Sequence, residues 1–299
     1  MKPVLIALKR SKWERDIMFY GSEDAAKKIY TLQNHTFERI YNSHLRQIEA
    51  RKKISGIFPH AVRAFREELP SVDFSKYSLI LSLGGDNHFV HTAQYVNEIP
   101  IGGINSDPET SSGVLLYFNL QSFSEPGRKE YDSDQIETEN WSLIECEIHF
   151  SDGQKIFTGE AVSEISIRNK FAEHMSRYLI RSAGTDPEEQ KCSGLLLSTG
   201  TGSTGWFSNC VPVEAFQGNC SFEKNAGFFR FTARERKTGE KFSLHYGEIQ
   251  KGGTLELISE MDGIICMDSD NKRVYPFPPG SKAYFRLSEK KLRVVRKFN

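Results

Sequence analysis

The residues Gly84, Gly85 and Asp86 stand where an apolar run ends and a helical pattern begins, in the stretch SLILSLGGDNHFVHTAQYV (residues 78–96). Two glycines let the backbone turn sharply and approach a ligand, and the amides that open a helix point toward an anion placed there. A carboxylate beside phosphates can orient Mg²⁺ or accept a proton from an attacking hydroxyl. The same residues also suit an ordinary strand-to-helix turn with Asp86 as its N-cap, so this signal alone leaves both interpretations open.

A second polar cluster lies in CSGLLLSTGTGSTGWF, residues 192–207. A short apolar strand opens there into a loop dense in hydroxyl groups, from Thr199, Thr201, Ser203 and Thr204. Such a loop can bind phosphate or ribose through many modest hydrogen bonds, although a plain Gly/Ser hairpin has the same composition. The segment lacks the lysine of GxxxxGK[ST], and no GxGxxG follows the first strand, which excludes a P-loop and that dinucleotide fingerprint.

Two shorter segments add polar residues at expected strand ends. In GGINSDPETSSG, Asn105 and Asp107 lie on a loop just after a strand, where α/β folds place ligands. In VSEISI, Ser163 and Glu164 interrupt a β pattern, and a glutamate in that position commonly faces solvent. These segments therefore supply candidates for a site without defining its chemistry.

The elements that must position these residues change character along the chain. VLIAL near the amino end, YSLILSL and IPIGGIN predict buried strands, and residues 89–97 between the last two predict a helix. Strand, helix and strand at this spacing form a βαβ unit and so a parallel sheet. Residues 23–69 have apolar positions at helical spacing and predict one or two amphipathic helices, the last in PHAVRAFREEL.

From about residue 140 onward, alternating segments such as WSLIECEIHF and GFFRFTARE predict a mostly antiparallel β domain. The polar, turn-rich segment 124–140 is the expected boundary. We therefore expect an α/β domain over 1–125 with the GGD turn and a β-rich domain over 140–275 with the STGTGST loop. Residues 276–299 form a C-terminal strand and tail that could return to the first domain.

Composition excludes several classes of protein. Lys+Arg and Asp+Glu are both 39 in 299 residues, so the net charge is +0 and bulk attraction to nucleic acid is not expected. No apolar run approaches the roughly 20 residues of a transmembrane helix, so no membrane partner is expected. The five cysteines are odd in number and show no CxxC spacing, which favours a reducing, cytoplasmic setting.

Taken together and in this order, the motifs resemble those of the NAD kinase family: a GGDG turn, a GxNxGxxG loop, an Asn-Glu pair on a strand and a TPTGST-type loop. The resemblance is closest to the mitochondrial-type members, since GGINSDPETSSG is similar to their GVNTDPxxSxG and EEQKCSGLLLSTGTGSTGWFSN to their QKSSGLxLxTGTGSxxW. It implies a fold of the NAD kinase/diacylglycerol kinase type, with an N-terminal α/β nucleotide-binding domain and a C-terminal β-rich domain. It also implies ATP-dependent phosphorylation of the adenosine 2′-hydroxyl of NAD(H).

The resemblance assigns roles by position. Asp86 would take the hydroxyl proton, and the backbone around it would meet the phosphates of ATP through Gly84, Gly85, Asn87 and His88. Binding of the acceptor nucleotide would fall to Asn105, Asp107, Ser163, Glu164, Thr199, Thr201, Ser203 and Thr204. Asp268 matches the family's late Asp-Gly less closely. Mg²⁺ with ATP is the expected cofactor, and a homodimer or larger homo-oligomer is the expected assembly.

The chain departs from the family beside the acid and at the pair on the strand. Asn87 and His88 stand where the family has Gly and Thr. Asn tolerates the positive φ that a glycine there permits, and His88 either contacts phosphate or packs away. His88 and His91 share a helix face, but no third ligand is visible and no metal site is expected.

Ser163 replaces the Asn of the pair and has a shorter reach than an amide. Two alternatives therefore stay open: a related kinase of another hydroxyl acceptor, such as a sugar, polyol or lipid headgroup, and a non-catalytic nucleotide-binding homologue. The choices between NAD and NADH and between ATP and polyphosphate as donor are also left open.

Overall fold

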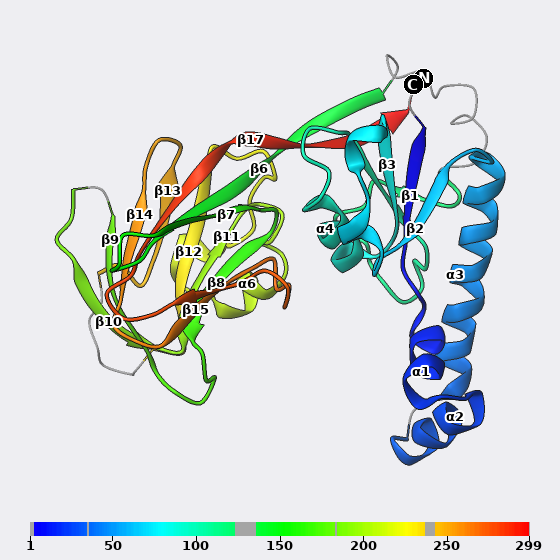
Figure 1. The fold of residues 1–299 in the computed structure, drawn as a ribbon, viewed down its shortest axis with the longest axis horizontal. Helices are drawn as coiled ribbons and strands as arrows, with labels where there is room; N and C mark the ends of the chain where they lie inside the picture. Colours follow the sequence, from blue (N-terminus) through cyan, green and yellow to red (C-terminus); the bar gives the residue numbers. More distant parts are fainter. Residues whose placement is uncertain (1–2, 35, 123–135, 183, 237–242, 299) are drawn as a thin grey trace. The chain divides into compact units, whose positions relative to one another are not determined.

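The computed structural model describes residues 3–34, 36–122, 136–182, 184–236 and 243–298. Two compact units result: Met1–Glu139 with Arg293–Asn299, and Asn140–Leu292. The division points fall inside two long strands, β6 (Ile136–His149) and β17 (Lys282–Phe298) (Figure 1). The boundary expected over 124–140 lies mostly outside the described residues, and residues 276–292 group with the second unit.

The first unit alternates strands and helices about a parallel sheet (Figure 1). Its elements are β1 (Val4–Leu8), α1 (Lys12–Tyr20), α2 (Glu23–Leu32), α3 (Phe37–Ile57), β2 (Val62–Phe65), β3 (Leu79–Gly84), α4 (Asp86–Ala93), β4 (Ile101–Asn105) and β5 (Phe118–Asn119), with short 3₁₀ turns at Leu69–Ser71 and Phe74–Lys76. The sheet order is β2-β1-β3-β4, with β5 beside β4, and each of these pairs is parallel. The predicted βαβ unit, β3-α4-β4, is confirmed. Val294 of β17 pairs in parallel with Ile101 of β4, which ties the end of the chain to this unit.

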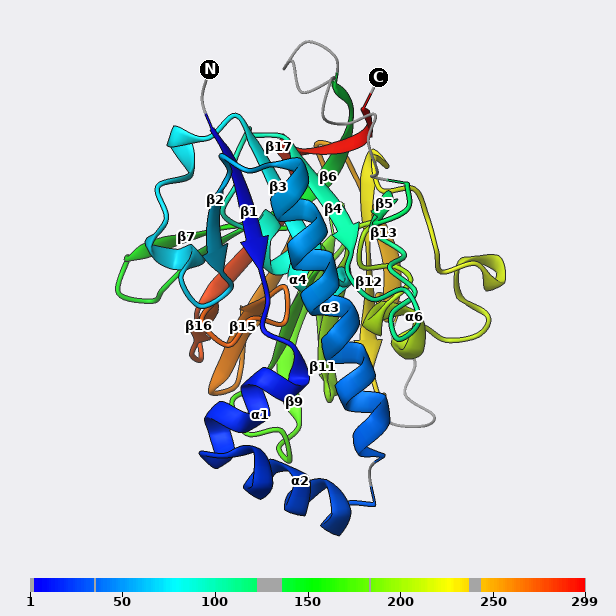
Figure 2. The same ribbon diagram turned by 90° about the vertical axis from the view of Figure 1, so that its right-hand side faces the viewer.

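Helices cover both faces of this sheet, because neighbouring strand residues point to opposite sides. Val4, Ile6 and Leu8 share a core with Ala50 and Ile54 of α3. On the other face α4 packs against β3. Figure 2 shows α3 in front of the sheet and α4 behind it. Covered on both faces, β1, β3 and β4 are almost continuously apolar, as their sequences suggest.

The helix expected over PHAVRAFREEL is wrong. Val62–Phe65 form strand β2, which pairs in parallel with β1 from Leu5↔Val62 to Leu8↔Phe65. Phe65 packs against the core beneath α3. Four residues are too few for their spacing to decide between helix and strand, and pairing with a neighbouring strand overrides local propensity.

Helices α1 and α2 pack at one end of α3 (Figure 2). A capping box opens α1: the Glu14 amide donates to Ser11 Oγ, and the Ser11 amide donates to Glu14 Oε2 at 2.7 Å. Arg51 of α3 donates two hydrogen bonds to the same carboxylate, at 2.7 and 2.6 Å. Burial raises the pKa of Glu14, but the hydrogen bonds from Arg51 and Ser11 outweigh it and lower this pKa to about 2.

Stability should depend on pH through Glu14. Its pKa is lower in the folded chain than the ordinary 4.5, so its contribution is complete above about pH 4.5 and is lost as the pH falls toward 2. We expect Glu14→Gln to lower the melting temperature at pH 7, and the difference from the parent to shrink between pH 5 and pH 3. Glu38→Gln, which removes an exposed carboxylate from α3, is the control. A difference from the parent that is constant across this pH range would contradict the assignment.

The second unit consists of two antiparallel layers. Besides most of β6 and β17, it contains β7 (Lys155–Ala161), β8 (Glu164–Asn169), β9 (Ser176–Ser182), β10 (Glu188–Cys192), β11 (Gly194–Ser198), α6 (Trp206–Cys210), a 3₁₀ turn at Ala215–Gly218, β12 (Phe228–Arg234), β13 (Tyr246–Gln250), β14 (Leu255–Ser259), β15 (Gly263–Met267) and β16 (Val274–Phe277). One sheet has the order β13-β12-β11-β8-β15-β16, and β10-β9-β14-β17 lie in the other. Ile165, Leu197 and Phe231 of the first layer share a core with Ile180 and Leu257 of the second. The predicted antiparallel β-rich domain is confirmed.

Candidate active site

The GGD turn joins β3 to α4 in the first unit. Gly85 is the N-cap of α4 and has no side-chain cap, and Asp86 is the first helical residue. The interpretation of Asp86 as the N-cap is therefore wrong. Its carboxylate turns instead to a neighbouring loop, where Oδ1 accepts a hydrogen bond from the Leu115 amide at 2.9 Å and Oδ2 accepts one from the Val114 amide at 3.1 Å. The two amides fix the position of a half-exposed carboxylate at the helix start.

The two residues after the acid take different positions. Asn87 lies inside α4 with its side chain exposed and has no positive φ, so its tolerance of that conformation is not needed here. His88 is buried, with Nε2 at 3.1 Å from the Ala7 carbonyl oxygen. Because a carbonyl can only accept, Nε2 must carry the proton. Burial lowers the pKa of His88 to about 3, so the ring is neutral at pH 7.

The His88 ring also explains one of the two glycines. A Cβ atom on Gly84 would lie 2.7 Å from His88 Cδ2, which is closer than real contacts allow. A Cβ on Gly85 would meet Ser111 Oγ at 3.0 Å. Gly84 thus makes room for a packed side chain of this protein, while Gly85 lies at the surface of the cavity described below.

The loop after β4 is held together by the two residues that the sequence singles out there. Asn105 Oδ1 accepts a hydrogen bond from the Asp107 amide at 3.1 Å, and Nδ2 donates to the Ser111 carbonyl oxygen at 2.8 Å. The buried Asp107 accepts from Ser43 Oγ at 2.5 Å and from Arg46 Nε at 2.6 Å, both on α3. Both side chains therefore shape the loop that brings two amides to Asp86.

Gly113 is the critical position of this loop. Its φ is +62°, and a Cβ atom there would lie 2.5 Å from Asn105 Nδ2. We expect Gly113→Ala to displace Asn105 and the two amides that follow, and to cost about 1–3 kcal/mol of stability from crowding beyond the strain of a positive φ. Gly153→Ala is the matched control, since its φ is +87° and a Cβ there meets nothing within 4 Å. Urea unfolding measures both, and equal losses would contradict the contact.

A cavity of about 520 Å³ opens beside the GGD turn, within the first unit. Gly85, Asp86, Asn87 and His88 line one side of it. Its other walls carry basic side chains that sequence reasoning missed: Lys9, Arg10, Lys12, Arg15 and Arg66. The basic segment KRSKWER directly after the first strand could have indicated these residues. Parallel strands end at the same edge of a sheet, so a segment that follows the first strand lies near the turn that follows β3.

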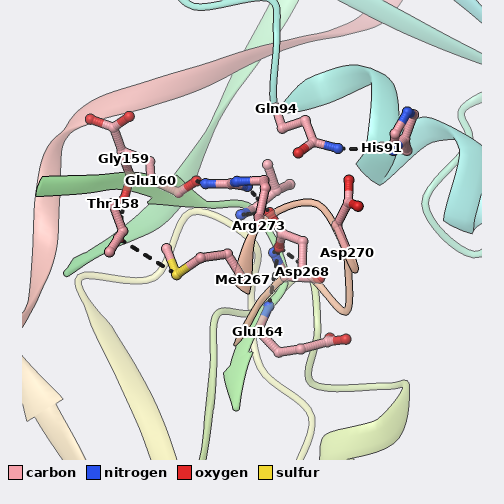
Figure 3. A network of polar contacts seen from close by, with 12 residues as sticks. His91, Gln94, Thr158, Gly159, Glu160, Glu164, Met267, Asp268, Asp270 and Arg273 are labelled. Carbon is pink, nitrogen blue, oxygen red and sulfur yellow. Dashed lines mark hydrogen bonds and ion pairs between the residues drawn. The ribbon is translucent and has the colours of Figure 1, made fainter. Parts of the chain in front are cut away.

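In the second unit, one buried carboxylate organises Ser163 and Glu164. Asp268 accepts hydrogen bonds from the Ser163 amide at 2.7 Å, from Ser163 Oγ at 3.0 Å and from the Val162 amide at 3.1 Å, and Arg273 pairs with it at 2.9 Å (Figure 3). Ser269 Oγ donates to Glu164 Oε1 at 2.8 Å. Burial first, and then the nearby Asp268, raise the pKa of Glu164. Glu164 therefore does not simply face solvent.

The hydroxyl-rich loop lies against the same backbone. The Thr199 amide donates to the Ser163 carbonyl oxygen at 3.0 Å, and Thr199 Oγ1 donates to that of Val162 at 2.7 Å. Ser203 Oγ donates to the Gly200 carbonyl oxygen at 2.8 Å. Thr201 is buried with no hydrogen bond from its hydroxyl, and Thr204 is exposed. The loop thus uses two of its four predicted hydroxyls for its own structure.

The structure brings the predicted residues together in two groups, one in each unit. The first comprises the GGD turn with Asn105 and Asp107, and the second comprises Ser163 and Glu164 with the loop at 199–204.

In the described part of the chain, no three His, Cys, Asp or Glu side chains lie close enough together to form a metal site. His91 donates to or accepts from Gln94 at 2.9 Å on α4 (Figure 3). None of the helices described is long and apolar enough to cross a membrane.

Comparisons with known proteins bear on this arrangement. No family profile matches the chain. The chain is 28% identical over 138 residues to the NAD kinase of Corynebacterium diphtheriae, covering 45% of this chain and 42% of that protein. It is 22% identical over 295 residues to the human mitochondrial NAD kinase 2, and this match covers 82% of this chain and 66% of that protein. With several bacterial and archaeal NAD kinases, the matched part spans about half the length of the relative.

Solved structures match over nearly the whole chain. An Archaeoglobus fulgidus NAD kinase, solved in complex with ATP, superposes with a TM-score of 0.61 at 18% identity and covers 99% of this chain and 94% of its own. Yeast NADH kinase, solved with NADH, superposes with a TM-score of 0.64 at 15% identity. This match covers 99% of this chain and 83% of the yeast chain. The α/β unit with its GGD turn and the β-rich unit thus form a fold shared with nucleotide kinases of this type. The resemblance to the NAD kinase family is confirmed by these matches.

Proposed function

We propose that the chain is an ATP-dependent kinase that phosphorylates the adenosine 2′-hydroxyl of NAD or NADH. The observation that carries the proposal is the Asp86 carboxylate, held by two backbone amides at the edge of a cavity with basic walls. The names of the matched relatives support the same reaction.

In the proposed reaction, the bond between the γ-phosphorus and the bridging oxygen of ATP breaks, and a bond forms between that phosphorus and the 2′-oxygen. The hydroxyl proton passes to Asp86, and ADP leaves with the electron pair of the broken bond. Such transfer depends mainly on positioning and on neutralising phosphate charge. Asp86 contributes to positioning through its fixed carboxylate. Lys9 and Arg15, which line the same cavity, are suited to neutralising phosphate charge.

Mg²⁺ is the proposed cofactor, and the residues present fit it. Asp86 and Glu67 line the same cavity and offer the oxygen ligands that Mg²⁺ prefers. Each amide bond to Asp86 uses only one lone pair of its oxygen. Asp86 would hold the ion together with the phosphates, and the bound ion would neutralise phosphate charge.

Acceptor recognition is proposed for Ser163, Glu164 and the exposed Thr204. Ser163 donates its hydroxyl hydrogen to Asp268, so it has only lone pairs left for an acceptor. This differs from the amide of the family's Asn and favours an acceptor screen that includes NADH, sugars and polyols besides NAD. A homodimer or larger oligomer and a cytoplasmic location are also proposed. The five free cysteines suit a reducing compartment, and sedimentation velocity tests the assembly.

The direct test is NADP formation by the purified protein with Mg-ATP and NAD or NADH, measured through an NADP-specific dehydrogenase. We expect turnover that requires both substrates and stops when Mg²⁺ is chelated. Protein that binds ATP and NAD but forms no NADP at stoichiometric enzyme concentration would overturn the proposal.

A further inference from the structure

The segment 211–227 connects α6 to β12 in the second unit and has a strained backbone. Two consecutive residues that are not glycine, Phe216 and Gln217, adopt the left-handed conformation, with φ of 52° and 57°. This conformation costs free energy in such residues and persists only where surrounding contacts hold it. Contacts from outside the segment must therefore fix it.

Arg230 of β12 makes contacts of this kind. Its guanidinium carbon lies 4.2 Å from the ring centroid of Phe216 and 4.8 Å from that of Phe222. Nη1 donates to the carbonyl oxygens of Asn219, at 2.9 Å, and Cys220, at 3.3 Å. The Arg230 side chain is only 14% exposed, and stacking of a cation on aromatic rings is stronger when the cation is shielded from water. One side chain thus holds four residues of the 211–227 segment.

The 211–227 segment in turn holds the hydroxyl-rich loop. The Phe222 amide donates to Ser203 Oγ at 3.3 Å, and Ser203 Oγ donates to the Gly200 carbonyl oxygen at 2.8 Å. Gly200 lies directly against the segment, because a Cβ atom there would overlap the Glu223 carbonyl group. The exposed Thr204 follows Ser203 in the chain. The position of Thr204 therefore depends on contacts that begin at Arg230.

We propose that Arg230 is a positioning residue for the acceptor nucleotide. It holds the 211–227 segment through two rings and two carbonyl groups, and this segment holds the hydroxyl-rich loop through Ser203. Arginine suits the role because its planar fork donates to several acceptors while its face stacks on aromatic rings. The inference rests on the proposed function, since acceptor recognition by Thr204 is part of that function.

The first test is hydrogen–deuterium exchange of the purified chain and its Arg230→Met variant, which keeps an apolar side chain between the rings. We expect amides in 199–204 and 219–222 to exchange about tenfold faster in the variant, because the carbonyl groups of the segment lose their donor. Exchange in both ranges that equals that of the parent would overturn the inference.

Arg181→Met is the matched control for this experiment. Arg181 of β9 lies directly opposite Glu256 of β14 and pairs with it. Arg230 has the same relation to Glu248 of β13, since the two are opposite one another and paired. Both variants therefore remove an arginine from a pair between neighbouring antiparallel strands. Arg181→Met should leave exchange in 199–204 unchanged, and an equal increase in both variants would contradict a specific role of Arg230.

Steady-state kinetics distinguish positioning from a loss of folded protein. Arg230→Met should raise KM for NAD or NADH about tenfold, because the loop that contacts the acceptor is no longer fixed. KM for ATP should change by less than about twofold, since the residues that line the cavity beside the GGD turn all belong to the first unit. A merely structural role would lower kcat and leave both KM values unchanged. That result, or an equal rise in both KM values, would overturn the inference.

A conservative variant tests the geometry of the contact. Arg230→Lys keeps a positive charge near Glu248, whose carboxylate accepts from Arg230 Nε at 3.1 Å, but loses the planar fork. We expect the lysine variant to resemble Arg230→Met in both exchange and acceptor KM. Full rescue by lysine would mean that charge pairing with Glu248 is sufficient, and would overturn the assignment of the stacked, forked contact.

The outcome is separable from that of the proposed function. If the parent forms NADP but Arg230→Met changes neither exchange nor the acceptor KM, the inference fails and the kinase assignment stands. If the parent forms no NADP, the proposed function fails, and the exchange experiment still decides whether Arg230 holds the hydroxyl-rich loop.

Discussion

Replacing Asp86 by asparagine should lower kcat for NADP formation by about 10²- to 10⁴-fold, the range that a positioned general base contributes. An amide cannot take the proton of the acceptor hydroxyl. It also offers only one acceptor atom, whereas the carboxylate accepts one hydrogen bond from Val114 and another from Leu115. One of these amides therefore loses its partner, and the loop after β4 becomes less well held.

Kinetics and binding together distinguish these two effects. Loss of the base lowers kcat while ATP still binds in the absence of Mg²⁺, whereas a disordered loop also weakens this Mg²⁺-free binding. Asp73→Asn is the control, because Asp73 is exposed and its partners, Ser75 and Lys76, are its near neighbours in the sequence. A variant that keeps more than about a tenth of the parental kcat would remove Asp86 from the role of base.

The elements that carry the turn are those that the sequence predicts well. β3 and β4 are short, continuously apolar and bounded by glycine, and their buried, two-sided packing produces that pattern directly. β2 is different, since Val62 and Arg63 are exposed and only pairing with β1 makes the segment extended. α1 was missed even though its capping box is visible as Ser11 and Glu14, because its apolar face is complete only when Trp13 packs with α2 and α3.

The site shows the same division. Asp86 follows a strand and a pair of glycines, and this local pattern can be recognised in the amino-acid sequence alone. Lys9 and Arg15 come to the cavity only because β1 lies beside β3 in a parallel sheet, which is a property of the fold. The direction in which a side chain points also cannot be predicted from the sequence. Thr199 and Thr204 belong to the same hydroxyl-rich loop, yet Thr199 bonds to the backbone of Val162 and Thr204 faces solvent.

Replacing Asp268 by asparagine should destabilise the second unit by about 3–5 kcal/mol, the cost of removing one partner from a buried ion pair. The Asp268 side chain is 1% exposed, and that of its partner Arg273 is 16% exposed. Arg273 would then lose its counter-charge and keep its hydrogen bond to the Glu160 carbonyl oxygen, at 2.6 Å. The new NH₂ group would take the place of one oxygen, so either the Val162 amide or the Ser163 amide would lose the acceptor that it needs. Asparagine is the suitable replacement because Asp268 has a φ of 51°, which this residue tolerates.

The reverse deletion should cost less. In Arg273→Met the Asp268 carboxylate keeps three donors from Val162 and Ser163, so a charge is left with hydrogen bonds but without its cation. The double variant should lose less stability than the sum of the two single variants, since the second change removes a group that the first has already left unpaired. Urea unfolding of the four proteins measures this coupling. Additive losses would mean that the pair does not hold the turn that places Ser163 and Glu164, and that the backbone contacts alone position the acceptor side of the proposed site.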